Sequence, residues 1–220
     1  MKVAAPRTEA ELLQRAESLA GKTLAEIAKP LFWAVPPDLR RHKGWIGQLI
    51  EAALGATAGS RAEPDFPQLG IEMKTLPLNA RGEPRESTFV CTAPLDGSLA
   101  RTWEESWLRR KLSRVLWVPV LGEGPPGERR VARPLLWSPS PEEETQLKAD
   151  WTELTDLIGT GAFWEIHGRR GHVLQLRPKA ASAESHTWTL DEEGNPIAEH
   201  PRGFYLRTRF TRALVERYYF

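Results

Sequence analysis

Cysteine is almost absent from this sequence of 220 residues, which contains Cys91 and no other. A single cysteine cannot form a disulfide bond within the chain, so we exclude a disulfide-stabilised secreted domain. Long apolar runs are missing too, because stretches such as 115–122 are far too short to span a bilayer. The first residues lack the apolar segment of a signal peptide. We therefore expect a soluble protein of the cytoplasm that does not act at a membrane.

The sequence also has no large excess of charge of one sign, since 30 basic and 29 acidic residues give a net charge of +1. The basic residues nevertheless gather in four clusters, at 40–43, 109–114, 169–170 and 202–212. Charge that is segregated in this way fits a positive cleft for nucleic acid on a nearly neutral body. Each cluster taken alone is explained more simply as the solvated face of a surface helix.

Helical and strand patterns alternate along the chain without an internal repeat. We predict helices over about 8–21, from 23 to the proline-containing segment 30–37, and over 44–55, 102–113, 140–158 and 210–219. We predict strands over 70–76, 86–93, 115–120 and 131–137, and a hairpin that joins 163–166 to 173–176. Residues 79–84 should connect the first two strands as a hairpin, with Phe89 and Cys91 on one face of the second. These patterns indicate a mixed α/β fold.

Three acidic residues and one lysine form the strongest candidate site. Glu72 and Lys74 are two positions apart in a predicted strand, so their side chains share one face of it. Asp65 lies in the preceding loop and can reach the same place. Glu51 is a charged residue in a helix that is otherwise largely apolar. We predict that these four side chains converge.

This set suits the hydrolysis of a phosphodiester with a magnesium ion. Magnesium takes oxygen ligands and keeps several waters, so carboxylates from different elements are sufficient to hold it. The ion would polarise the phosphoryl oxygen and activate a water molecule. The lysine can orient that water or stabilise developing negative charge. The same spacing also fits an ordinary solvent-facing Glu/Lys pair on a strand, which would have no catalytic role.

The chain resembles the MutH family of mismatch-repair endonucleases from about residue 10 to residue 219. The resemblance rests on ordered blocks of sequence at 43–78, 86–95, 110–120, 133–144, 174–180 and 201–211. It is weakest over about 182–200. It implies the fold of type II restriction endonucleases, which is a mixed central sheet flanked by helices, with two lobes that form a DNA cleft. We expect one domain over 1–220, with its catalytic lobe centred on about 40–120 and its DNA-recognition lobe mainly in 121–220.

The resemblance also implies an activity. A member of this family nicks the unmethylated strand of double-stranded DNA, 5′ to the G of a hemimethylated GATC site. MutL activates it, downstream of a complex between MutS and the mismatch. The implied cofactor is Mg²⁺, with Mn²⁺ as a substitute, and the implied form is a monomer.

The resemblance assigns roles to individual residues. It implies a catalytic set and a metal-binding set that overlap: the catalytic residues are Asp65, Glu72, Lys74, Glu51 and Lys111, and the metal ligands are Asp65, Glu72, Met73 and Glu51. Its DNA-binding residues are Lys43, Arg177, Lys179 and Tyr205, and Tyr205 would sense the N6 methyl group of adenine. Without the resemblance, Arg177 and Lys179 fit surface salt bridges and Tyr205 fits a half-buried packing residue.

Two other functions stay open at this point. A restriction endonuclease could read the same GATC site, although such relatives usually carry a second nuclease-like half, and this chain has one catalytic set. A DNA-binding module without activity would not need Glu51, Asp65, Glu72 and Lys74 together.

Overall fold

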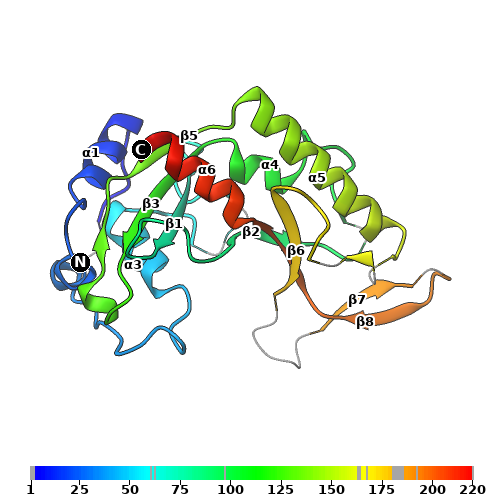
Figure 1. The fold of residues 1–220 in the computed structure, drawn as a ribbon, viewed down its shortest axis with the longest axis horizontal. Coiled ribbons are helices and arrows are strands. Elements are labelled where there is room, and N and C mark those ends of the chain that lie inside the picture. Colours follow the sequence, from blue (N-terminus) through cyan, green and yellow to red (C-terminus); the bar gives the residue numbers. More distant parts are fainter. Residues whose placement is uncertain are drawn as a thin grey trace. The chain divides into compact units, whose positions relative to one another are not determined.

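The chain forms two compact units, and it passes between them more than once. The computed structural model describes residues 3–59, 61, 63–96, 98–162, 165–166, 168–179, 186–191 and 193–219. The first unit comprises Met1–Arg85, Ser113–Ser138 and Tyr218–Phe220. The second unit comprises Glu86–Leu112 and Pro139–Arg217. Each unit therefore combines segments that are distant in the sequence (Figure 1).

The first unit begins with short helices whose starts agree with the sequence. Its helical elements are α1 (Glu9–Glu17), α2 (Leu24–Ala28), η1 (Lys29–Leu31), α3 (Trp45–Leu54) and η2 (Pro126–Glu128). The Thr8 side chain accepts a hydrogen bond from the amide of Glu11 at the start of α1, and Thr23 forms a capping box with Glu26 at the start of α2. Helix α1 ends at Glu17, earlier than the predicted end near residue 21.

A mixed sheet holds the first unit together. Strand β1 (Glu72–Leu78) pairs in parallel with β3 (Val115–Leu121), and β3 pairs antiparallel with β4 (Arg130–Val131) and β5 (Leu135–Trp137). The single strand predicted over 131–137 is thus two short strands. Pro134 lies between them, and a proline cannot donate to a strand ladder.

Helix α3 packs on one side of β1. Leu49, Ile50 and Leu54 of this helix belong to the same buried cluster as Ile71 and Met73. Side chains alternate along a strand, so a core on the Met73 side leaves Glu72 and Lys74 on the other face of β1. The helix and the strand were both predicted, and their contact fixes which face of β1 is available for chemistry.

The second unit contains an antiparallel sheet in the order β2 (Thr88–Ala93), β9 (Arg202–Leu206) and β6 (Leu174–Pro178). A separate ribbon pairs β7 (Thr187–Leu190) with β8 (Pro196–Glu199). The sequence did not predict β7, β8 or β9. The ribbon falls in the stretch where the family resemblance is weakest.

The structure corrects two predictions about the strands. The chain does turn at 79–84, where Leu78 and Pro84 form an antiparallel bridge, but the predicted pairing of the first two strands is wrong, because β1 pairs with β3 and β2 pairs with β9 in the other unit. The prediction that Phe89 and Cys91 share a face is also wrong, because a bulge lies between them and shifts the register of the strand. Strand β6, whose predicted partner was 163–166, pairs with β9. Phe163 and Trp164 of that predicted hairpin lie outside the described residues.

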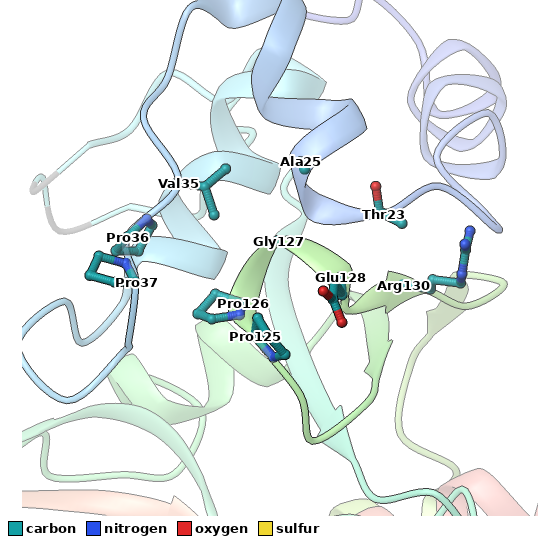
Figure 2. A pocket seen from close by; sticks show the side chains of 10 residues that line it. All are labelled: Thr23, Ala25, Val35, Pro36, Pro37, Pro125, Pro126, Gly127, Glu128 and Arg130. Carbon is teal, nitrogen blue, oxygen red and sulfur yellow. The ribbon is translucent and has the colours of Figure 1, made fainter.

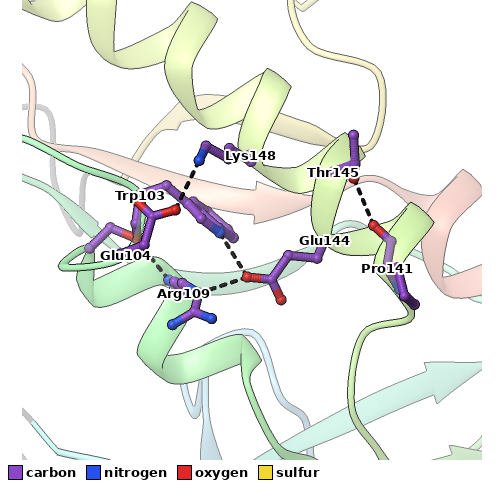
Figure 3. Close-up of polar contacts among 8 residues, drawn as sticks. Trp103, Glu104, Arg109, Pro141, Glu144, Thr145 and Lys148 are labelled. Carbon is purple, nitrogen blue, oxygen red and sulfur yellow. Dashed lines mark hydrogen bonds and ion pairs between the residues drawn. The ribbon is translucent and has the colours of Figure 1, made fainter.

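Helices α4 (Trp107–Leu112), α5 (Pro141–Gly159) and α6 (Thr208–Tyr219) complete the fold, with the capping box of Ser140 and Glu143 at the start of α5 as predicted. Helix α4 is shorter than predicted. Figure 3 shows how Glu144 of α5 accepts hydrogen bonds from the Trp103 indole at 2.9 Å and from Arg109 at 2.6 Å. Among the described helices, none has the length and apolar character that crossing a membrane would require.

Candidate active site

Glu72 and Lys74 form a buried ion pair on β1. The Lys74 ammonium donates to Glu72 Oε1 at 2.5 Å, and the two side chains are only 14% and 2% exposed. These low exposures exclude the alternative that Glu72 and Lys74 are an ordinary solvent-facing pair. A charge that is removed from water is costly unless it is paired, so this part of the chain keeps two desolvated charges in one fixed geometry. Such desolvated, paired groups are concentrated at functional sites.

Asp65 lies beside this pair because of a short local bridge. Phe66 and Ile71 form an antiparallel bridge, which places the residue before it, Asp65, opposite Glu72. Asp65 Oδ2 accepts a hydrogen bond from the Met73 amide at 2.8 Å. Strand β1 is an edge strand of its sheet, and the Met73 amide points away from β3. The Asp65 carboxylate supplies the hydrogen-bond acceptor that this amide requires. The Asp65 carboxylate is thus held at the residue that follows Glu72 on the strand.

Glu51 is half-buried near the end of α3. The main-chain carbonyl of Asp65 accepts hydrogen bonds from the amides of Thr57 and Ala58, so the loop that carries Asp65 is tied to the segment that follows the helix. The Glu51 carboxylate lies over Gly47, one turn back on α3, where a Cβ would be 3.8 Å from Oε1. Hydrogen bonds between main-chain atoms therefore connect the end of the helix that carries Glu51 to the loop that carries Asp65.

The donor chemistry of the site fits a hard cation. Asp65, Glu72 and Glu51 supply carboxylate oxygens, which are the ligands that magnesium prefers. The Met73 side chain is buried in the core, so only its main-chain carbonyl is a suitable donor. Within the described ranges, no three Asp, Glu, His or Cys side chains form a group that could hold a metal ion. The metal set stays a prediction.

The predicted DNA-binding residues Arg177, Lys179 and Tyr205 lie on one face of the sheet in the second unit. Strand β6 alternates buried Leu174 and Leu176 with outward-facing Gln175 and Arg177. The Arg177 guanidinium lies 5.5 Å from the centre of the Tyr205 ring. The Lys179 ammonium lies 4.1 Å from the centre of the Phe89 ring. We name this surface the β6–β9–β2 face, defined by Gln175, Arg177, Lys179, Tyr205, Phe89, Ser87 and Thr92.

Several members of this face were not singled out from the sequence. Phe89 meets Tyr205 edge to face with ring centres 5.3 Å apart, and the two residues are direct cross-strand partners. Ser87 Oγ accepts hydrogen bonds from Gln175 and Arg177, and Thr92 Oγ1 accepts one from Lys179. These contacts join residues about 90 positions apart, so identifying them requires knowing that both β2 and β6 pair with β9.

The β6–β9–β2 face changes the acidity of two of its groups. Partial burial raises the pKa of the Tyr205 phenol, and the nearby Arg177 acts in the opposite direction. Partial burial likewise lowers the pKa of the Lys179 ammonium. Both shifts favour uncharged forms, which is the expected effect of desolvation beside aromatic rings.

Two further predicted residues, Lys43 and Lys111, come from other elements of the fold. Lys43 is exposed in the segment before α3. Lys111 of α4 lies 5.2 Å from the centre of the Trp107 ring. The basic clusters are partly accounted for by ion pairs, such as Arg114 with Glu9 and Arg170 with Glu165. Arg114 and Arg170 are therefore explained as surface residues that form ion pairs.

One pocket of the first unit, in the described part of the chain, is distinct from the candidate site. It has a volume of about 760 Å³ and is lined by Pro36, Pro37, Pro125 and Pro126, with Glu128 at its edge (Figure 2). No predicted catalytic residue lines it. The site at Glu72 is a buried ion pair beside a loop carboxylate, and it is recognised by its chemistry.

The buried Glu72–Lys74 pair beside the Asp65 carboxylate is an arrangement that an enzyme can use. Residues 54–150 match the family model described as the DNA mismatch repair enzyme MutH, so the class of protein is a DNA mismatch repair enzyme. Over 98% of its length the chain is similar to proteins that are named DNA mismatch repair protein MutH. The chain belongs to the MutH family.

Three relatives show how far this similarity extends. The protein from Vibrio cholerae serotype O1 is 56% identical over 217 residues, which cover 98% of each chain. The protein from Pectobacterium atrosepticum is 54% identical over 98% of this chain and 94% of its own. The protein from Serratia proteamaculans is 53% identical over 98% of this chain and 95% of its own. The similarity therefore includes both units.

Proposed function

We propose that this chain is a magnesium-dependent endonuclease that nicks the unmethylated strand at hemimethylated GATC sites, 5′ to the G. In this proposal MutL activates it, after MutS has bound a mismatch, and the enzyme acts as a monomer in the cytoplasm. Its fold would be that of type II restriction endonucleases, with a catalytic lobe and a DNA-recognition lobe. The observation that carries the proposal is the buried Glu72–Lys74 pair, with Asp65 held on the next residue of the strand.

The proposed catalytic groups have separate tasks. Asp65, Glu72 and Glu51, together with the main-chain carbonyl of Met73, would hold Mg²⁺. When bound, the ion would polarise the scissile phosphate and lower the pKa of a water ligand. Glu72 holds the Lys74 ammonium in place through the 2.5 Å contact. Lys74 can then stabilise negative charge that develops on the phosphate, without the cost of reorganising in the transition state.

The β6–β9–β2 face would supply sequence recognition. Arginine and lysine are the usual donors to guanine O6 and N7 in the major groove, which gives roles to Arg177 and Lys179. Tyr205 would contact the N6 position of adenine, where a methyl group changes the fit. Lys43 and Lys111 would contact phosphates, which adds affinity without sequence information.

The test is nicking of a supercoiled plasmid with Mg²⁺, MutL and ATP. Glu72→Gln should lower the nicking rate at least about a hundredfold, because a positioned catalytic group contributes about that much or more. The control Glu17→Gln changes an exposed residue at the end of α1 and should leave the rate unchanged. Gel shifts should show that both variants still bind DNA.

Glu72→Gln leaves Lys74 without its carboxylate, so the variant must also be tested for folding. The double variant Glu72→Gln, Lys74→Met removes both charges of the pair and separates loss of chemistry from loss of fold. Normal nicking by a folded variant of either kind would reject the site. Efficient double-strand breaks without MutL would instead favour a restriction endonuclease.

A further inference from the structure

Ser87 has an unusual place on the β6–β9–β2 face, because one hydroxyl receives two side chains from another strand. Ser87 lies just before β2, and it is half-buried. Its Oγ accepts from Gln175 Nε2 at 2.9 Å and from Arg177 Nη1 at 3.0 Å. Gln175 is the direct cross-strand partner of Tyr205. The hydroxyl therefore joins two residues of the proposed recognition surface, one of which pairs with Tyr205.

Arg177 needs such a contact more than most side chains do. It is exposed, and an arginine that is fixed in one geometry loses about 2 kcal/mol of rotamer entropy. The Ser87 hydroxyl on one nitrogen and the Tyr205 ring at 5.5 Å fix both the position and the orientation of the guanidinium. A guanidinium has five N–H donors, so this contact leaves others for a base edge. A donor that is already in place binds its target without losing that entropy again.

We propose that Ser87 is a positioning residue for DNA recognition: its hydroxyl holds Arg177 and Gln175 in the geometry that reads the bases. This rests on the proposed function, since it assumes that Arg177 contacts the GATC site. Ser87 itself need not touch DNA. Its removal should weaken binding to the correct site and leave binding to other sequences unchanged, because contacts with phosphates do not depend on this geometry.

The experiment compares dissociation constants for a GATC duplex and for a duplex with one base pair changed, by fluorescence anisotropy. Ser87→Ala should lower the ratio between the two constants roughly threefold to tenfold, the factor that one ordinary hydrogen bond contributes. Ser87→Thr keeps a hydroxyl and should restore most of the ratio. Ser98→Ala removes an exposed hydroxyl that bonds to Asp96, and should have no effect. Thermal unfolding of each variant shows whether the second unit is intact.

A double-mutant cycle tests whether Ser87 acts through Arg177. Arg177→Ala should lower the ratio, and adding Ser87→Ala should lower it little further. If the effects of the two substitutions add fully, or if Ser87→Ala weakens binding to both duplexes equally, the positioning role is wrong. If Arg177→Ala lowers the ratio and Ser87→Ala does not, this inference alone fails. If wild-type protein does not prefer GATC, or Arg177→Ala leaves the preference unchanged, the proposed recognition fails and this inference fails with it.

Discussion

Asp150 makes a buried connection between α5 and the start of β6, and its replacement by asparagine should be costly. This residue is 4% exposed. Its Oδ2 accepts the amides of Val173 and Leu174 at 2.6 and 2.7 Å, and its Oδ1 accepts the amide of His172 at 2.9 Å and Gln146 Nε2 at 3.2 Å. Every one of these four partners is a donor. Both oxygens of the side chain must therefore act as hydrogen-bond acceptors.

Asparagine has one oxygen and one amino group, so it cannot accept at both positions. Its best orientation keeps the oxygen on the buried amides of Val173 and Leu174 and turns its amino group toward the other two donors. A buried donor without an acceptor costs about 1–3 kcal/mol, and the lost charge also weakens the two bonds that remain. We expect Asp150→Asn to lower the free energy of unfolding by about 2–4 kcal/mol.

Urea unfolding followed by tryptophan fluorescence measures this loss. With a urea dependence of a few kcal/mol per molar, the midpoint should fall by about 1 M or more. Asp156→Asn is a matched control, because it makes the same change at an exposed position of α5. An exposed substitution of this kind usually changes stability by less than about 0.5 kcal/mol. Equal urea midpoints for the two variants would refute the claim that both Asp150 oxygens are needed as hydrogen-bond acceptors.

Three further predictions concern other parts of the chain. Gly55→Ala should destabilise the protein more than Gly70→Ala: both glycines have positive φ, but a Cβ at Gly55 would lie 2.3 Å from the Ala4 carbonyl oxygen, whereas at Gly70 it meets nothing within 4 Å. Equal urea midpoints would contradict this. Burial raises the pKa of Tyr219 from 10.0 to about 12, so its contribution to stability is complete below pH 10 and is lost as the pH rises toward 12. Tyr219→Phe should therefore lose less stability than wild type over that interval, and parallel losses would refute the assignment. Tyr205→Ser should weaken the preference of nicking for hemimethylated over fully methylated GATC sites, and an unchanged preference would remove Tyr205 from that role.

Features that depend on neighbouring residues were predictable from the sequence. The caps at Thr23 and Ser140 lie where the pattern places them, because a cap is made within one turn of helix. The shared face of Glu72 and Lys74 followed from the two-residue period of a strand. The position of Asp65 opposite Glu72 also has a short-range cause, the bridge between Phe66 and Ile71. The arrangement of Asp65, Glu72 and Lys74 therefore has largely local causes.

Strand pairing was not predictable in the same way, because it joins distant segments. Strands β1 and β2 are neighbours in the sequence, yet they belong to different units. The β6–β9–β2 face illustrates the consequence. Its arginine and tyrosine come from strands separated by the stretch where the resemblance is weakest, and Ser87 comes from a segment about 90 residues earlier. No periodicity within one segment contains that information.

The two parts of the proposed mechanism should therefore differ in how they respond to mutation. The proposed catalytic pair and Asp65 lie on one strand and the loop before it, and the packing of α3 and the pairing with β3 hold that strand in place. The β6–β9–β2 face depends on the register of three strands and on the acceptors that Asp150 supplies to the start of β6. Substitutions that disturb this register should reduce the preference for a sequence before they reduce the rate of hydrolysis. If the proposed function is correct, the long-range contacts of the β6–β9–β2 face maintain specificity rather than chemistry.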